Sequence, residues 1–90
     1  MLTPVYHGSF KKDRKLMKKQ NRNMESLNVV MNMLINEQPL PTKNENHSLH
    51  GNYKNWQECH IEPDWFLIYR IEKVSQHIYF FRTGSHSELF

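Results

Sequence analysis

Three histidines, an aspartate and an arginine in the second half of this 90-residue chain carry side chains suited to acid–base and phosphate chemistry. They are His47, His60, Asp64, Arg82 and His86. Imidazole titrates near neutral pH, and a guanidinium binds a phosphate through two parallel hydrogen bonds. RNA cleavage without a metal needs a base for the 2′-hydroxyl, an acid for the leaving 5′-oxygen and a fixed cation for the phosphate. The residue types therefore indicate this reaction as a candidate.

A zinc site is the competing use of the same residue types, because histidine, cysteine and aspartate all bind zinc. Cys59 and His60 are neighbours on a predicted strand, where successive side chains point to opposite faces, so they cannot share one ion. The chain has no Cys-x-x-Cys or His-Glu-x-x-His spacing. Its single cysteine excludes an internal disulfide, and we expect Cys59 to be a packing residue rather than a nucleophile. A site without a metal is the favoured interpretation.

The N-terminal part reads as a short strand followed by a basic helix. Leu2–Tyr6 is apolar with β-branched residues, and Pro4 confines such a strand to the edge of a sheet. Strong helix formers run from Phe10 to about Gln20, and Ser9 is the expected N-cap of this helix.

A second helix has the clearest periodicity in the chain. Its apolar residues recur at 3-4-3 spacing, as expected for one buried helix face: Met24, Leu27, Met31 and Leu34. Asn23 is placed to cap this helix, and the prolines at 39 and 41 cannot continue it. A short turn before Asn23 predicts that the two helices form an antiparallel hairpin.

The C-terminal half changes to a strand pattern. Residues 42–52 are polar and predict a loop. Three runs rich in aromatic and β-branched residues follow, Tyr53–Ile61, Trp65–Glu72 and His77–Thr83, and short turns make them an antiparallel meander. The middle run is apolar at consecutive positions, so both of its faces should be covered. The expected fold class is α+β, in the order β-α-α-β-β-β, with the N-terminal strand at an edge and the helical hairpin on one face.

The meander brings two of the candidate residues together. His60 ends the first meander strand and Asp64 begins the next, so a tight turn holds them close in space. Arg82 ends the last predicted strand, and His86 follows it in the tail.

The charge of the chain is unevenly distributed. Its net charge is +3, yet residues 1–22 hold seven bases and one acid, and the remainder holds five bases and eight acids. A basic N-terminal segment suggests a polyanion or an acidic protein partner, although a solvated helix face has the same composition. The length allows one domain, and no apolar run reaches the roughly 18 residues of a membrane span. We expect a cytosolic protein without a signal peptide.

Three segments in register resemble the YafQ family of type II toxin–antitoxin toxins, within the RelE/ParE superfamily. They are HSLHG at residues 47–51, ECHIEPDWFLIY at 58–69 and RTGSHSELF at 82–90. The helical hairpin before them agrees as well, so the resemblance covers nearly the whole chain and implies a single RelE-like domain over residues 1–90.

The resemblance implies an endoribonuclease without metal or other cofactor, which enters the ribosomal A site and cuts mRNA. It also implies a cytoplasmic protein that does not bind membranes. A cognate antitoxin of ribbon-helix-helix type would block the toxin, and operator DNA would be bound only through the toxin–antitoxin complex.

Carried over by position, the functional residues of the family are His47, His60, Asp64, Arg82, His86 and Phe90. His86 resembles the general acid and Arg82 the phosphate clamp. His60 and Asp64 resemble the pair that activates the 2′-hydroxyl, and which of them is the base is left open. His47 would position phosphate or share in proton transfer. Phe90 would stack on a nucleotide, or else be a terminal residue tucked into the core.

One position departs from the family pattern. Gln57 stands where an arginine is usual in the family, so this position contributes no positive charge to RNA binding. The basic helix would compensate by binding ribosomal RNA through Lys11, Lys12, Arg14, Lys15, Lys18 and Lys19. Two alternatives remain: a module that poisons a protein target, as in the gyrase-directed ParE branch, and an inactive toxin that binds DNA with its antitoxin. The ParE branch lacks the histidine–arginine set, which favours the enzyme.

Overall fold

The computed structural model describes residues 1–90, apart from the side chain of Asn52. One strand and two helices come first: β1 (Thr3–Tyr6), α1 (Gly8–Lys19) and α2 (Met24–Ile35). Two 3-10 turns flank a short strand: η1 (Thr42–Asn44), β2 (His47–Ser48) and η2 (Gly51–Tyr53). The meander and a last helical turn follow: β3 (Gln57–Glu62), β4 (Trp65–Glu72), β5 (His77–Gly84) and α3 (His86–Leu89). The expected α+β order is confirmed, with β2 and α3 as additions.

The five strands form one sheet in the order β1-β5-β4-β3-β2. The predicted meander is present, because β3, β4 and β5 pair antiparallel in sequence order. β1 lies at one edge and pairs parallel with β5, which agrees with Pro4 in that strand. At the other edge, His47 and Ser48 pair with β3, so the prediction of an unbroken loop over 42–52 was wrong. Two residues are too short for a periodic pattern, and only their pairing with β3 makes them a strand.

The helix boundaries differ from the prediction mainly at the start of α1. α1 begins at Gly8, after an extended His7, so Ser9 lies inside the helix and is not its N-cap. The Ser9 hydroxyl instead donates to the backbone oxygen of Phe81 in β5, 2.8 Å away, and so ties the helix to the sheet. Asn23 stands at the N-terminal capping position of α2, as predicted, but its side chain makes no capping hydrogen bond.

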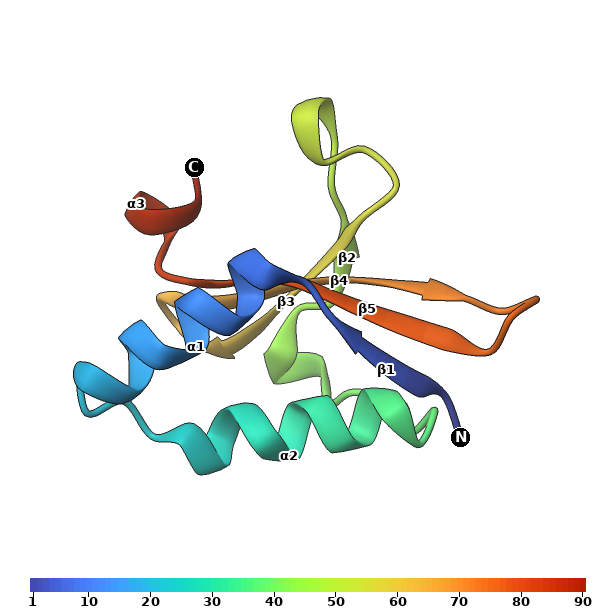
Figure 1. The fold of residues 1–90 in the computed structure, drawn as a ribbon, viewed down its shortest axis with the longest axis horizontal. Helices are drawn as coiled ribbons and strands as arrows, with labels where there is room; N and C mark the ends of the chain where they lie inside the picture. The colour runs from blue at the N-terminus through green and yellow to red at the C-terminus, as the bar shows by residue number, and fades with distance from the viewer.

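The main core lies between the helices and one face of the sheet. Buried residues of α1 and α2, such as Phe10 and Leu27, pack with Trp65, Leu67 and Phe80 of the sheet in one cluster. α2 runs below the sheet, and η2 and α3 lie above it (Figure 1). On that upper side Phe66, Ile68 and Leu89 form a smaller cluster with partly buried aromatic residues. Both faces of β4 are therefore covered, as its continuous apolar run predicted.

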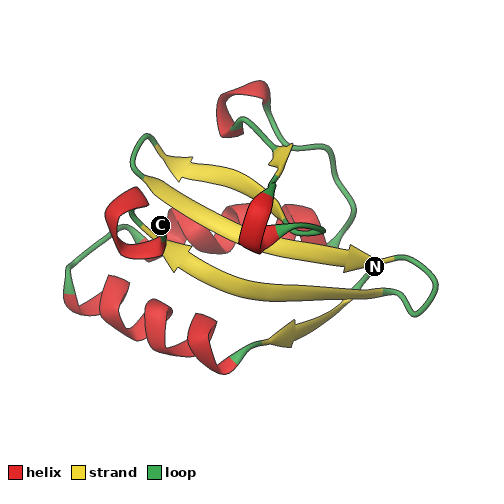
Figure 2. Cartoon of the chain, turned by 90° about the horizontal axis from the view of Figure 1, so that it is seen from above, coloured by secondary structure: helices red, strands yellow, loops and turns green.

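Two β-bulges interrupt the sheet, one in β3 and one in β5. The register shifts between His60 and Glu62, and again opposite the Ile68–Tyr69 step, where Phe81 is the extra residue of β5. A bulge bends a strand and redirects nearby side chains, and it is often found beside active sites. Here one bulge adjoins His60 and the other adjoins Arg82. The meander and the adjoining α3 are seen from above in Figure 2.

Among the described helices, all are too short or too polar to cross a membrane.

Candidate active site

A series of aromatic contacts joins three of the predicted histidines. The ring of His60 lies edge-on against Phe66, with 4.6 Å between ring centroids, and the ring of His86 is also edge-on to Phe66, with 6.1 Å between centroids. The ring centroids of His47 and His60 are 6.4 Å apart. Phe66 comes from the central strand and is 7% exposed, so it is a firm support for both imidazoles. Phe66 lies in a strand that the sequence predicted, but it was not among the predicted site residues.

His47 is held by acceptors at both ring nitrogens. Nδ1 lies 2.7 Å from the backbone oxygen of Glu45, and because a carbonyl can only accept, Nδ1 donates. Nε2 lies 3.2 Å from Oε1 of Glu58, whose side chain is only 8% exposed. Contacts on both sides fix the orientation of this ring. Glu58 was not a predicted site residue, although the alternation of β3 places it on the opposite face from Cys59, next to β2.

His60 has one ring nitrogen beside a carboxylate. Its Nδ1 lies 3.4 Å from Oε2 of Glu45, and the carboxylate favours the tautomer with the proton on Nδ1. That tautomer leaves Nε2 with a lone pair that can accept a proton. The backbone oxygen of His60 accepts a 2.6 Å hydrogen bond from the side chain of buried Asn44, which fixes the strand here.

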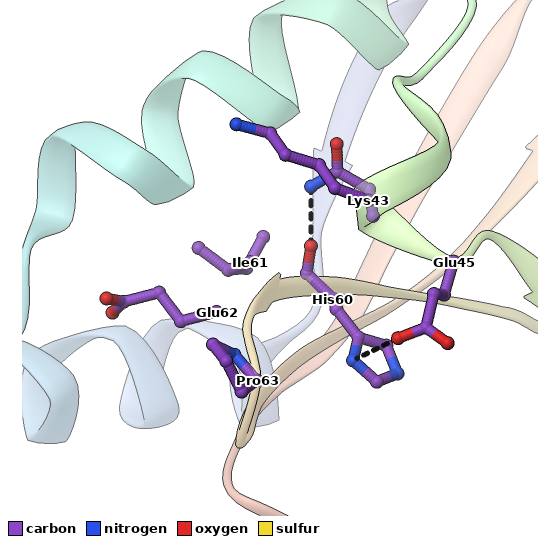
Figure 3. A pocket seen from close by; sticks show the side chains of 7 residues that line it. Lys43, Glu45, His60, Ile61, Glu62 and Pro63 are labelled. Atoms are coloured by element: carbon purple, nitrogen blue, oxygen red, sulfur yellow. Dashed lines mark hydrogen bonds and ion pairs between the residues drawn. The ribbon is translucent and has the colours of Figure 1, made fainter.

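His60 and Glu45 stand at the edge of a cavity of about 410 Å³. Figure 3 shows the two side chains meeting at one side of it, with Lys43 and Glu62 on its other walls. The remaining lining comes from Asn44, Ile61 and Pro63. Open, polar space therefore adjoins the imidazole that can act as a base.

Asp64 contacts His86 through the main chain. Its Oδ1 accepts from the backbone N–H of His86 at 3.2 Å, at the start of α3. A capping box holds the same turn, since the Ser85 hydroxyl accepts from the Glu88 N–H and the Glu88 carboxylate accepts from the Ser85 N–H. The hydrogen bond from the Ser85 backbone lowers the pKa of Glu88. The Ser-x-x-Glu signature of this box is visible in the sequence, so α3 could have been predicted.

His86, the first residue of α3, and Phe90, which directly follows this helix, are both exposed. Their rings lie 5.1 Å apart, and Phe90 is 51% exposed. Tyr53 lies edge-on to Phe90 at 5.3 Å and donates to the backbone oxygen of Leu89 at 3.0 Å. A cavity of about 620 Å³ lies here, lined by His50, Tyr53, Phe81, Leu89 and Phe90. Phe90 is thus a surface ring beside a cavity, and the alternative of a core residue was wrong.

Arg82 is the predicted site residue that is held by a carboxylate of α1. Its Nε and Nη2 donate to the two carboxylate oxygens of Asp13 in α1, at 2.6 and 3.1 Å. Hydrogen bonding to Asp13 raises the pKa of Arg82, and nearby Tyr53 adds to this. Asp13 was not among the predicted site residues, because the composition of residues 1–22 indicates only a basic surface. The contact is made between residues far apart in the sequence, so no local pattern could reveal it.

The predicted RNA-binding residues of α1 have two kinds of surroundings. Lys11, Lys12, Lys15, Lys18 and Lys19 are exposed. Arg14 is partly buried, and its guanidinium lies 5.3 Å from the ring centre of Tyr6 and 5.4 Å from that of Phe10. Arg14 therefore also packs against the core.

The arrangement of the site residues bears on whether they could bind a metal. Among the side chains that the structure describes, no three histidines, cysteines or acids stand close enough to hold a metal ion. Cys59 lies in the main core, whereas His60 contacts Phe66 on the other face, as the strand alternation predicted. Burial raises the pKa of the Cys59 thiol to about 12, so it remains protonated and is a packing residue.

A meander backed by a helical hairpin, with histidines and acids gathered at one end of the sheet, defines a small toxin of RelE-like fold. Residues 2–90 match the family described as bacterial toxin of type II toxin–antitoxin system, YafQ, and the chain belongs to this family. The expected family and fold class are thereby confirmed.

Named relatives and solved structures agree with this membership. The mRNA interferase toxin YafQ of Escherichia coli (strain K12) is 41% identical over 86 residues, which cover 94% of this chain and 91% of the relative. A crystal structure of a metal-bound toxin from Helicobacter pylori has a TM-score of 0.93 and 41% identity, with both chains covered completely. The toxin in a crystal structure of the E. coli DinJ-YafQ complex has a TM-score of 0.90 and 38% identity, over 100% of this chain and 99% of that one.

Proposed function

We propose that this toxin is an mRNA interferase, an endoribonuclease that cleaves mRNA by attack of a 2′-hydroxyl on the adjacent phosphate. The name of the E. coli relative supports the enzyme class. The observation that carries the reaction type is that His60 and His86 both lie against the ring of Phe66. Two imidazoles held beside one ring can serve the two proton transfers of an in-line displacement.

His60 is the general base in this proposal. Glu45 favours a proton on Nδ1, so Nε2 is free to accept the proton of the 2′-hydroxyl. The cavity beside His60 gives space for a ribose. Asp64 holds the backbone of His86 instead, so it acts as a positioning residue for α3. Of the two candidates for the base, His60 and Asp64, the proposal therefore takes His60.

His86 is the general acid, and the proton balance closes without a metal. As His60 takes the 2′-hydroxyl proton, the O2′–P bond forms and the P–O5′ bond breaks, and His86 gives its proton to the leaving O5′. The products are a 2′,3′-cyclic phosphate and a 5′-hydroxyl. The fixed His47 ring and the Arg82 guanidinium stabilise the charge on the phosphate, and exposed Phe90 stacks on a neighbouring base.

Partners of the toxin follow from its exposed surfaces and its relatives. YafQ of E. coli forms a complex with DinJ, and we infer that an antitoxin of ribbon-helix-helix type likewise covers this toxin and links it to operator DNA. The substrate is mRNA in the ribosomal A site, where the five exposed lysines of α1 contact ribosomal RNA. The site of action is the cytoplasm.

The test compares His86→Ala and His60→Ala with His77→Ala, a histidine outside the ring series. Each variant is added to ribosomes programmed with labelled mRNA, and the 3′ ends of the products are examined by mass spectrometry. We expect the first two variants to lose about 100-fold or more in cleavage rate, and His77→Ala to cleave normally with cyclic phosphate ends. Full cleavage by His86→Ala, or toxicity without cleavage, would contradict the proposal and favour a binding module.

A further inference from the structure

Asp13 is the single acidic residue among residues 1–22, which otherwise hold seven bases, and it points at the sheet rather than into solvent. Its side chain is 13% exposed, and that of Arg82 is 26% exposed. Besides its two contacts to Arg82, Asp13 accepts from the backbone N–H of Thr83 at 3.1 Å. A surface helix selected only for positive charge has no need of this carboxylate.

The support behind Asp13 is rigid. Thr83 is 1% exposed, and its hydroxyl donates to the backbone oxygen of Phe66 at 2.8 Å and accepts from the indole of Trp65 at 2.9 Å. The carboxylate of Asp13 is thus anchored to Thr83 of β5, which is itself hydrogen-bonded to Phe66 of β4, the residue whose ring contacts both imidazoles. A guanidinium bound to this carboxylate has a fixed place relative to the candidate active site.

Asp13 binds one edge of the guanidinium. Arginine has five N–H donors in a planar fork, and Asp13 accepts from the pair on Nε and Nη2. The other donors, on Nη1 and Nη2, form the second edge of the fork, which also matches a phosphate, and Tyr53 lies nearby. Asp13 therefore does not compete for the same edge as a phosphate but determines where the second edge points.

We propose that Asp13 is a positioning residue that aligns Arg82 on the scissile phosphate. The proposal rests on the proposed function, since it takes Arg82 to be the phosphate clamp. A misplacement of about 1 Å costs up to about 100-fold in rate, so loss of the carboxylate slows cleavage by about 10- to 100-fold. The same loss removes a negative charge from beside the phosphate site, so RNA binding becomes equal or tighter. A merely structural role would weaken both binding and cleavage.

The experiment uses Asp13→Asn, with Glu25→Gln as the matched control. Both substitutions remove one negative charge, but Glu25 is an exposed residue in the first turn of α2. Single-turnover cleavage is measured on ribosomes with saturating toxin, and affinity is measured by anisotropy of a labelled single-stranded RNA. We expect only Asp13→Asn to slow cleavage, and neither variant to weaken binding.

A double-mutant cycle shows whether Asp13 acts through Arg82. Adding Asp13→Asn to Arg82→Ala should cost nothing further, because the residue to be aligned is already missing. Arg82→Lys retains the charge but not the fork, and we expect the same loss as for Asp13→Asn. Thermal melting of each variant with its antitoxin establishes the folded fraction, to which the rates are normalised.

Two results would overturn the role of Asp13: an unchanged cleavage rate in Asp13→Asn, or an equal loss in the Arg82→Ala background. A different result bears on the proposed function itself. If Arg82→Ala cleaves at the normal rate, Arg82 is not the phosphate clamp, whatever Asp13→Asn does.

Discussion

Replacement of Phe66 is the most direct test of how the candidate active site is held together. The Phe66 ring contacts both His60 and His86, and it is nearly buried on the upper face of the sheet. Phe66→Leu keeps an apolar side chain of similar volume but removes the flat ring that both imidazoles contact. The expected result is a large loss of cleavage rate with a modest loss of stability.

The magnitude follows from the contacts. A volume-conserving core substitution costs less than about 1.5 kcal/mol, and each lost aromatic pair adds about 0.5–1.5 kcal/mol. Two such pairs are lost, so we expect about 1–4 kcal/mol less free energy of unfolding. Release of the two imidazoles from their support costs about 10- to 100-fold in rate.

Phe80→Leu is the matched control. Phe80 is fully buried in the main core, and its ring contacts Tyr6 at 5.7 Å and Phe10 at 5.6 Å. The same substitution therefore removes two aromatic pairs on the face away from the site. Denaturant unfolding measures the stability of both variants, and single-turnover cleavage on ribosomes, corrected for the folded fraction, measures their activity. Equal rate losses in the two variants, or a normal rate in Phe66→Leu, would refute the role of Phe66.

Two further predictions concern acid stability and metals. The lowered pKa of Glu88 means that its contribution to stability is complete above the ordinary glutamate value of about 4.3 and is lost as the pH falls through the folded-state value. The melting temperature of Glu88→Gln should therefore lie below that of the unaltered toxin at neutral pH and approach it in acid, and a constant gap would contradict this origin. For the metals, a chelator selective for zinc and copper should leave ribosome-dependent cleavage unchanged, since the proposed proton transfers use only imidazoles. A loss of cleavage that added metal restores would assign the reaction to a metal. The test is of interest because a similar toxin has been crystallised with a bound metal.

Local patterns in the sequence predicted most of the secondary structure. The bounds of β4 at Trp65 and Glu72 were predicted to the residue, because turn residues flank a short run rich in aromatic and β-branched residues on both sides. The start of β3 was predicted four residues too early, at Tyr53, because Tyr53 belongs to η2 and Trp56 to the loop that follows it. Aromatic side chains favour strands on average, but here they cover the second face of the sheet from a loop.

The sequence by itself determined the family, the fold class and the types of residue in the candidate site, since three motifs in register depend only on order and spacing. Only the tertiary structure decided which carboxylate lies beside which histidine or arginine. It paired Glu45 with His60, Glu58 with His47 and Asp13 with Arg82. The last of these joins residues 69 positions apart in the chain. Such contacts depend on the packing of helices and strands against one another, and side-chain periodicity within one element carries no information about them.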